Sequence, residues 1–543
     1  EIAIMSVAAA GFLLQDMRVL LAALFATGVQ STLFGPVKYS ILPAVLKPEE
    51  LTGGNGLVEM GTSISILLGM LYGGLIFAVA GAIGPVAAGV SVVALAILGN
   101  LLSRRIPRVE ASAPDLAVQW NPIPETIKVW QLTRRQPAVR NAVLGVSWFW
   151  FTGTILTGNL PLYAEVYLGG TPTLYVFALA VFSVGVGVGS LLCEKLSART
   201  VEIGLVPLGA IGMTACLLDL ALSRQVPAVA TGLSVGGFLA TPGAWRTVAD
   251  LAGIGLFSGF YVVPLFALIQ SRVPGRELSR AIAGMNIQNA VFIVAAALGG
   301  IALQNLLGWT LPQLFLALAI AGVAVSLWIF LLVPEFLMRF LSWLLVKSLY
   351  RLRVRGVEAH VPDEGPALLV CNHVSYMDAL ILAGVVPRPV RFVMYWRIFE
   401  VPVMKWIFRT ARAIPIAGAR EDPALMQRAF DAVDAALAEG ELVGIFPEGR
   451  LTSDGDIAAF KSGVERILER ANAAGRPVPV VPMALRGMWA SMWSRRNSRL
   501  GRMRVPRRFR ARIEVVAGPP LDGRVATAPQ LEAEVRQLRG QDA

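Results

Sequence analysis

Long apolar runs dominate the chain up to residue 333, and shorter apolar runs separated by polar stretches follow. A helix needs about 20 mostly apolar residues to cross the hydrocarbon core of a bilayer. On this criterion the first part predicts ten spans, of which the first is short: 2–15, 19–45, 57–80, 85–103, 141–162, 173–193, 202–221, 250–270, 281–303 and 311–333. This part is therefore predicted to be an all-α polytopic membrane domain.

Lysine and arginine gather in alternate loops between these spans. Arg104, Arg105 and Arg108 begin one such loop, whereas the loops 81–85 and 224–247 on the opposite side carry little charge. Cytoplasmic loops of membrane proteins are enriched in lysine and arginine. We therefore expect the basic loops in the cytoplasm, with both ends of the chain on that side.

The loop 106–140 divides four predicted spans from six. Many transporters are built from two related halves, and a 4+6 division is what a 6+6 transporter looks like without its first two helices. The sequence begins at Glu1 rather than at methionine. We therefore expect it to be cut at its amino end.

The pattern changes after residue 333. Segment 334–350, with Arg339 and Lys347 among large apolar residues, predicts a helix that lies at the membrane surface. Beyond it, buried-strand runs alternate with amphipathic runs. Strands are expected at 367–371, 390–395, 442–446, 478–484 and 513–517, and helices at 376–383, 423–437 and 459–471. The prediction is a membrane domain over 1–333, an interfacial helix and linker over 334–355, and an α/β domain with a mixed sheet flanked by helices over 356–543.

The composition agrees with a membrane protein that has a soluble part, because 55% of residues are hydrophobic and 15% are charged. The net charge of +12 is concentrated after the last span and between 495 and 512. Beside membrane spans, such clusters favour anionic lipid headgroups over nucleic acid as partners. Three isolated cysteines predict neither a disulfide framework nor a metal site.

One of the two histidines follows an apolar strand and precedes an aspartate by five residues. His373 and Asp378 would not share a face of a regular helix, but they can meet across a strand-to-helix turn. Asp378 would then fix the imidazole tautomer and leave the other ring nitrogen to act as a general base. A purely structural hydrogen bond of His373 is an alternative. A Cys371–His373 thioester exchange is another, since the two residues would face one side of a continuing strand.

A second motif, Phe446-Pro447-Glu448-Gly449-Arg450, follows another apolar strand. The Pro and Gly residues predict a turn, and the arginine fork suits an anionic oxygen. With Asn372-His373-x4-Asp378, this motif resembles the phospholipid/glycerol acyltransferase family over about residues 345–543. The resemblance implies that His373 deprotonates a glycerol hydroxyl of a lysophospholipid, that Asp378 supports it, and that Glu448, Gly449 and Arg450 help bind the headgroup phosphate.

The sequence departs from the family pattern at two places. Arg450 directly follows Gly449, without the usual intervening threonine. That spacing resembles the branch that acts on 2-acylglycerophosphoethanolamine. The middle family block is weakly kept between Arg412 and Arg420, which the resemblance makes candidates for phosphate contact.

Polar groups also stand out in the membrane half. The segment 34–43, with Lys38, and the segment 55–59, with Glu59, resemble the lysophospholipid transporter branch of the major facilitator superfamily. The resemblance implies inward movement of lysophospholipid, with Lys38 and Glu59 in the transport machinery. Alternatively, both side chains reach the cytoplasmic interface from the span ends. The glycine-rich run 185–190 predicts close helix packing rather than a nucleotide loop.

Together these patterns predict a protein of the bacterial inner membrane that imports lysophospholipid and reacylates it, with its acyltransferase domain in the cytoplasm. No cofactor or metal is expected. No acyl-activating domain is recognisable, so the acyl donor would arrive as an acyl carrier protein or coenzyme A thioester. Two alternatives stay open: a lysophosphatidic acid acyltransferase of new phospholipid synthesis with the membrane half as anchor, and a transporter with a non-catalytic, lipid-sensing domain.

Overall fold

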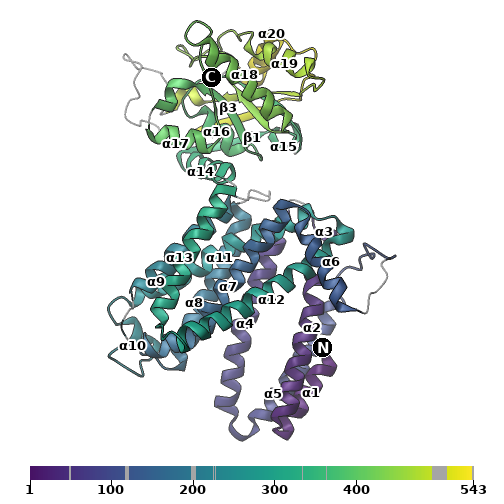
Figure 1. Ribbon diagram of the computed structural model, residues 1–543, viewed down its shortest axis with the longest axis vertical. Coiled ribbons are helices and arrows are strands. Elements are labelled where there is room, and N and C mark those ends of the chain that lie inside the picture. Colours follow the sequence, from purple (N-terminus) through teal and green to yellow (C-terminus); the bar gives the residue numbers. More distant parts are fainter. Residues whose placement is uncertain are drawn as a thin grey trace. The chain divides into compact units, whose positions relative to one another are not determined.

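The computed structural model describes residues 1–47, 50–115, 121–196, 204–223, 226, 228–332, 334–362, 364–400, 402–491 and 510–540. It divides into two compact units, Glu1–Phe330 and Leu331–Ala543 (Figure 1). The first unit is helical and the second contains a sheet. Both predicted fold classes are confirmed.

Helices account for the regular structure described in the first unit. They are α1 (Ile2–Leu14), α2 (Met17–Ser40), α3 (Leu42–Val45), α4 (Leu51–Ala80), α5 (Gly84–Ser103), α6 (Pro122–Arg134), α7 (Pro137–Val166), α8 (Pro172–Leu196), α9 (Leu205–Ser223), α10 (Val235–Leu239), α11 (Ala244–Arg272), α12 (Gly275–Asn305) and α13 (Leu311–Leu332), with a short 3₁₀ turn at Gly81–Ile83. A helix lies at each of the ten predicted spans.

Eight helices in the described part of the chain are long and apolar enough to cross a membrane. The two predicted spans outside that group are α1 and α7. Helix α1 has 13 residues, which is about 20 Å and shorter than the roughly 30 Å hydrocarbon core. Helix α7 has 30 residues, but its Trp, Thr and Gly residues lower its mean hydropathy.

The glycine-rich run 185–190 lies inside α8, where it allows close contact with α11. A Cβ atom added to Gly189 would lie 2.0 Å from the carbonyl oxygen of Leu256, and one added to Gly255 would lie 2.2 Å from that of Phe182. The two backbones therefore touch where only glycine fits. This confirms the helix-packing interpretation.

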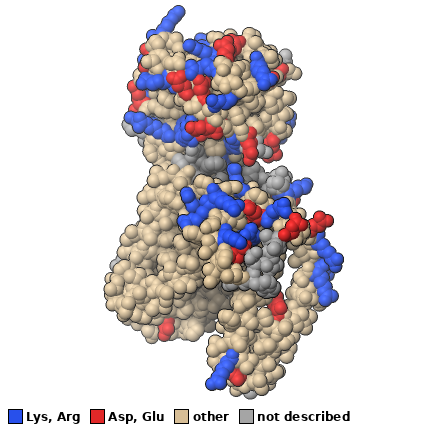
Figure 2. Space-filling model, turned by 45° about the vertical axis from the view of Figure 1, so that its right-hand side comes forward, with Lys and Arg blue, Asp and Glu red and all other residues tan. Residues whose placement is uncertain are grey.

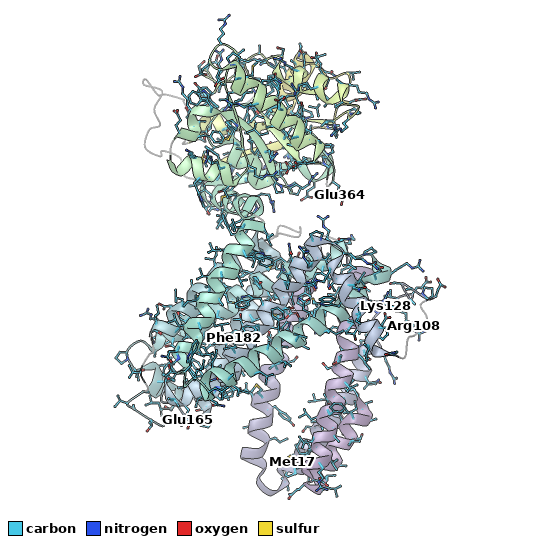
Figure 3. All side chains as sticks on the ribbon, viewed as in Figure 1. Met17, Arg108, Lys128, Glu165, Phe182 and Glu364 are labelled. Atoms are coloured by element: carbon cyan, nitrogen blue, oxygen red, sulfur yellow. The ribbon has the colours of Figure 1, made fainter. Side chains whose placement is uncertain are left out.

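Charged side chains are unevenly distributed over the membrane unit. Figure 2 shows long uncharged stretches on this unit, and most of its lysine and arginine side chains in that view gather at one end. Arg108 and Lys128 lie together at one end, whereas Met17 and Glu165 lie toward the other (Figure 3). The predicted basic loop therefore sits at a single end of the helical unit.

The second unit is built on a seven-stranded sheet of order β1-β7-β6-β2-β5-β3-β4. Only the β6–β7 pair is antiparallel, and the other neighbours are parallel. The strands are β1 (Tyr350–Arg355), β2 (Ala367–Cys371), β3 (Val390–Tyr395), β4 (Ile414–Ile416), β5 (Leu442–Ile445), β6 (Val480–Arg486) and β7 (Ala511–Ala517). This is the expected mixed sheet.

Helices cover both faces of the sheet and bury two apolar cores. Helices α14 (Pro334–Leu349) and α16 (Asp378–Val385) contribute to one core. Helices α18 (Pro423–Ala438), α19 (Gly463–Ala473) and α20 (Ala528–Arg539) contribute to the other. The short α15 (Val357–His360) and α17 (Pro402–Thr410), and 3₁₀ turns at Trp396–Glu400 and Met488–Ala490, complete the unit.

The segment 334–355 differs from the expected linker, because it is built into the soluble unit. Helix α14 packs on α16, where a Cβ atom on Gly384 would lie 2.8 Å from the Cα atom of Trp343. Strand β1 pairs in parallel with β7. Because arginines alternate with apolar residues in this strand, its sequence lacks the continuous apolar run by which the other strands were predicted. Strand β4 and helices α17 and α20 were not expected either, and the basic residues 495–508 lie outside the described residues.

Candidate active site and membrane polar cluster

The parallel strands β2, β5, β3 and β4 end at one edge of the sheet. The segment containing His373 follows β2, the segment 446–450 follows β5, and Arg420 follows β4. In open α/β sheets, ligands bind outside the carboxyl ends of such strands. The sheet topology therefore gathers two of the three predicted motif regions at one edge, together with part of the third.

His373 and Asp378 contact each other across the turn between β2 and α16. The Nδ1 atom of His373 lies 2.9 Å from Oδ2 of Asp378, and the Asp378 side chain is fully buried. The same oxygen accepts backbone N–H groups from Val374 at 2.6 Å and Ser375 at 2.8 Å. Because an ionised carboxylate only accepts, Nδ1 carries a proton and Nε2 keeps its lone pair. The turn thus presents a basic nitrogen.

The imidazole is held by its neighbours as well. Its ring stacks on Phe446 with centroids 4.2 Å apart. The adjacent Asn372 side chain donates to the carbonyl of Leu485 at 3.2 Å and accepts its N–H at 2.8 Å. These contacts fix the histidine turn to β6 on one side and to the end of β5 on the other. With 22% of its side chain exposed, His373 can still be reached from solvent.

Glu448 is buried, and both of its carboxylate oxygens accept backbone N–H groups. One carboxylate oxygen accepts the N–H of His373 at 2.7 Å, and the other accepts the N–H of Ala458 at 2.9 Å. Only 2% of Glu448 is exposed, and burial raises the pKa of its carboxyl group against the opposing effect of the two N–H donors. Both carboxylate oxygens of Glu448 are therefore engaged by backbone N–H groups, one of them that of His373, rather than directed at a headgroup.

The turn after Glu448 is held open by glycine. Gly449 has φ +62° and donates its N–H to the carbonyl of Phe446 at 3.0 Å. A Cβ atom at Gly449 would lie 2.5 Å from Nζ of Lys461. Lys461 therefore lies over the turn beside exposed Arg450. Sequence reasoning missed this lysine, because eleven positions separate it from the motif.

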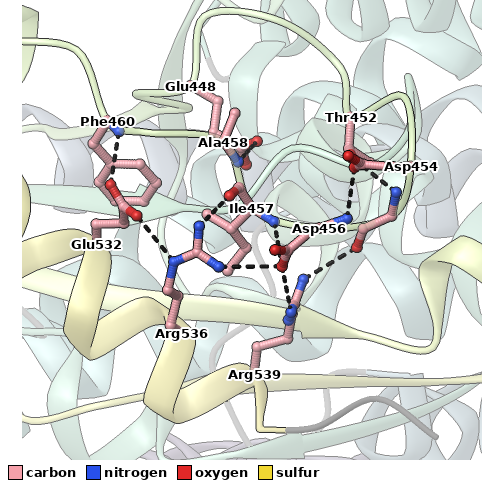
Figure 4. A network of polar contacts seen from close by, with 11 residues as sticks. Glu448, Thr452, Asp454, Asp456, Ile457, Ala458, Phe460, Glu532, Arg536 and Arg539 are labelled. Atoms are coloured by element: carbon pink, nitrogen blue, oxygen red, sulfur yellow. Dashed lines mark hydrogen bonds and ion pairs between the residues drawn. The ribbon is translucent and has the colours of Figure 1, made fainter.

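Helix α20 holds the loop that follows the motif (Figure 4). Arg536 and Arg539 both donate to Asp456, at 3.1 Å and 2.7 Å. Glu532 accepts the N–H of Phe460 at 3.1 Å and pairs with Arg536 at 2.9 Å. The Glu532/Arg536 spacing is the one sequence signal for this network, and it indicates only an exposed helix face.

The two arginines of the middle block separate in the structure. Arg412 pairs with Glu441 at 2.6 Å and Glu439 at 3.5 Å, just before β5 begins. It therefore lies at the amino edge of the sheet, so the structure does not bring it together with His373. Arg420 is exposed and lies after β4, at the edge that carries His373.

Cys371 closes strand β2 with its side chain fully buried in the core. Burial raises the pKa of its thiol well above the ordinary value. The strand ends at Cys371, so His373 does not continue it. A buried neutral thiol is a poor nucleophile, and the Cys–His alternative is therefore not supported.

In the membrane unit, Lys38 and Glu59 belong to one polar cluster between α2 and α4. The hydroxyl of Tyr39 donates to Glu59 at 2.6 Å, and Nζ of Lys38 lies 4.6 Å from the Tyr39 ring centroid. Glu59 is only 7% exposed, which argues against a side chain that reaches outward to the interface. Gln270 of α11 donates to the carbonyl of Tyr39 at 3.1 Å. The cluster thus joins helices on both sides of the loop 106–140.

Gln270 also exchanges two hydrogen bonds with Asn55 of α4, at 2.5 Å and 3.0 Å. Both side chains are buried. This amide pair ties α4 to α11 next to Tyr39. Sequence reasoning singled out the α4 segment that contains Asn55 but missed Gln270, because an isolated glutamine near a span end carries no spacing signal.

Two protein-family models match the chain. The Major Facilitator Superfamily model matches residues 2–253, and the Acyltransferase model matches residues 351–486. The protein is therefore a multi-pass membrane protein that joins a membrane domain of the major facilitator type to an acyltransferase-family domain.

Its membrane half is similar to lysophospholipid transporters named LplT. The LplT of Serratia proteamaculans is 32% identical over 45% of this chain and 56% of its own length. That of Cronobacter sakazakii is 31% identical over the same shares. The chain thus spans about half the length of the curated relatives it matches. Among solved structures, the 1-acyl-sn-glycerophosphate acyltransferase PlsC of Thermotoga maritima is 19% identical over 38% of this chain and 78% of its own, with a TM-score of 0.30.

Proposed function

We propose that this protein moves lysophospholipid inward across the bacterial inner membrane and reacylates it in the cytoplasm. Two observations support this function jointly: the similarity of the membrane half to LplT proteins, and an acyltransferase-family domain on the same chain. The observation that carries the enzymatic part is the His373 Nδ1–Asp378 contact of 2.9 Å, which leaves Nε2 basic.

The chemistry follows from this pair. Nε2 of His373 removes the proton of the free glycerol hydroxyl as its oxygen attacks the thioester carbonyl. The buried Asp378 carboxylate stabilises the imidazolium that forms. When the tetrahedral intermediate collapses, the C–S bond breaks and the imidazolium returns the proton to the leaving thiolate. The products are a phospholipid and a free thiol. The acyl carrier protein or coenzyme A thioester is the donor, and no cofactor takes part.

Cations at the same sheet edge are suited to the anionic headgroup. Arg450 and Lys461 lie together at the Gly449 turn, and Arg420 follows β4. A lysophospholipid phosphate bound by these side chains would bring its glycerol toward His373. Glu448 contributes by holding the backbone of His373, as its two N–H contacts indicate.

In the membrane half we propose that Lys38 and Glu59 act in transport. The amide pair Asn55–Gln270 and the bond from Gln270 to Tyr39 join the two halves of the helical unit beside these side chains. Opening a passage at this end requires those bonds to break. Lys38 lies beside these hydrogen bonds and would attract the lipid phosphate when they break. Anionic membrane lipids are the expected partners of the basic loops.

The test uses vesicles that hold the natural full-length protein, with the acyl thioester trapped inside and lysophospholipid added outside. We expect acylated product, and slower product formation for Lys38→Ala and Glu59→Ala, while both variants acylate detergent-solubilised lysolipid normally. Equal rates for both variants and the parent in both assays would reduce the membrane half to an anchor. Failure of all lysolipids to react in detergent would instead leave a transporter with a non-catalytic domain. A preference for lysophosphatidic acid in the detergent assay would favour the biosynthetic alternative.

A further inference from the structure

Helix α6 lies in the loop 106–140 and leaves one of its sides uncovered (Figure 1). Ile123, Ile127 and Trp130 on this side are 70%, 50% and 41% exposed. Successive spacings of four and three positions place the three side chains in one line along the helix. Large apolar side chains that gather on a surface in this way mark a place that binds a protein or a membrane.

Another side of α6 packs on α12. Val129, which lies about 200° around the helix from Ile127, is buried. A Cβ atom added to Gly284 of α12 would lie 2.6 Å from the carbonyl oxygen of Val129. Glu125 of α6 also accepts from Arg280 of α12 at 2.6 Å. These contacts fix the rotation of α6, so that its apolar line points away from α12.

The third side of α6 is basic. Lys128, Gln131 and the cap residue Arg135 follow one another along it at helical spacing. Lys128 lies 3.6 Å from Glu125 and its side chain is 54% exposed. Arg135 lies 3.1 Å from Glu277 of α12 and its side chain is 66% exposed. The helix therefore has one side for protein, one apolar side and one charged side, as expected where protein, lipid and water meet.

The position of α6 along α12 agrees with this interpretation. The charged residues at the start of α12 end at Arg280, and the apolar part of the span begins at Ala281. Gly284, which α6 contacts, lies three positions further, or about 5 Å along the axis. Helices that lie in a membrane interface bury their apolar side by about 5–10 Å at this boundary. At that level, the surroundings of a membrane span are lipid.

We propose that α6 is an interfacial helix that binds anionic lipids in the leaflet at its end of the membrane unit. Ile123, Ile127 and Trp130 lie among the acyl chains, and the basic side chains contact the phosphate groups. Arg134 continues the apolar line, and its guanidinium carbon lies 4.2 Å from the centroid of the Trp130 ring. From there the charge reaches the headgroups while the stem stays in the apolar layer. The proposal holds whether or not the protein moves lysophospholipid.

Quenching by labelled lipids tests the insertion. A cysteine-free form of the full-length protein receives a fluorescent label at Ile127→Cys, or at Lys128→Cys on the basic side as the matched control. Both are placed in discs of phosphatidylethanolamine and phosphatidylglycerol. Lipids with a nitroxide on the acyl chain should quench the label at position 127 more strongly than at 128. Iodide in the buffer should quench the two labels in the opposite order.

The same labels show which outcome contradicts the insertion. Equal quenching by the nitroxide lipids at the two positions would overturn it. A label at Ile127→Cys that neither quencher reaches would also overturn it, because a protein surface would then cover this side. If Ile127→Cys does not fold, Ile123→Cys places the label on the same line.

The requirement for anionic lipid is tested in discs of phosphatidylcholine with an increasing share of phosphatidylglycerol. Nitroxide quenching at Ile127→Cys should rise with that share. Arg134→Gln should weaken the insertion equilibrium about fivefold, the effect of one basic residue at an anionic surface. Arg18→Gln should leave it unchanged, because Arg18 is exposed next to Met17, toward the other end of the unit (Figure 3). Quenching that is independent of phosphatidylglycerol, or equal effects of the two variants, would refute the anionic preference.

Discussion

Substitution of Glu448 by glutamine separates a positioning role from a headgroup role. Glutamine keeps one carbonyl oxygen for one of the two N–H groups, at His373 (2.7 Å) or Ala458 (2.9 Å), and turns an NH₂ group toward the other. At a site that is 2% exposed, the lost bond is not replaced by water. Hydrogen bonds to a charged group contribute about 1.5–3 kcal/mol. We therefore expect the free energy of unfolding of the soluble unit to fall by about 2–3 kcal/mol.

Activity should fall through kcat. A displacement of a catalytic group by about 1 Å can cost about 100-fold in rate. The hydrogen bond that the substitution weakens is made by the backbone N–H of His373 itself. Steady-state kinetics on solubilised lysolipid would therefore show a kcat about 100-fold lower and a nearly unchanged KM for lysolipid. Glu439→Gln is the matched control, because Glu439 is 60% exposed in a weak pair with Arg412. A higher lysolipid KM with unchanged kcat and stability would refute the positioning role.

The raised pKa of Glu448 adds a dependence on pH. A carboxyl group that binds its proton more tightly when folded stabilises the fold below its unfolded pKa. That contribution is lost as the pH rises through the folded pKa. The wild-type soluble unit should therefore lose this part of its stability on the alkaline side of the ordinary glutamate pKa. Glu448→Gln should lack that loss, as denaturant titrations at several pH values would show. Parallel pH profiles for the two proteins would contradict the assignment.

Three further outcomes are expected. His373→Ala should lower acyl transfer by about 100-fold or more without loss of folding, whereas Cys371→Ala should keep most activity. An inactive Cys371→Ala variant beside an active His373→Ala variant would instead favour thioester exchange at Cys371. Arg450→Ala should raise the KM for lysolipid more than that for the donor, and Arg412→Ala should leave both KM values unchanged. An unchanged lysolipid KM for Arg450→Ala would remove it from the phosphate site. Glu59→Gln should weaken the contact with the Tyr39 hydroxyl and slow lysolipid entry into vesicles, while the rate in detergent stays at the parent value. A slower detergent rate would show damage beyond the membrane half.

The apolar pattern alone was sufficient for the elements whose environment is uniform along the chain. The ten predicted spans coincide with helices, because burial in lipid or protein requires apolar residues over a whole helix length. Strands 367–371 and 390–395 were predicted at their observed bounds. Every residue of the first is buried, as expected for a central strand that is covered on both faces. Strand β1 was missed, since an edge strand with alternating arginines has no such signature.

The sequence also predicted the His373–Asp378 contact that the structure shows at the candidate active site. His373 and Asp378 lie five positions apart, and a strand-to-helix turn is enough to bring them together. Short-range geometry of this kind follows from local backbone preferences. The same is true of the turn at Gly449, whose positive φ favours glycine.

Tertiary structure alone decided the roles that depend on distant partners. One oxygen of Glu448 accepts the backbone N–H of His373, which lies 75 positions away. Arg412 was drawn to the opposite edge of the sheet by Glu441. What a charged side chain can do depends on the opposite charge or hydrogen-bond donor that it contacts. The sequence shows that such a side chain is present, but its partner follows only from how distant parts of the chain pack together.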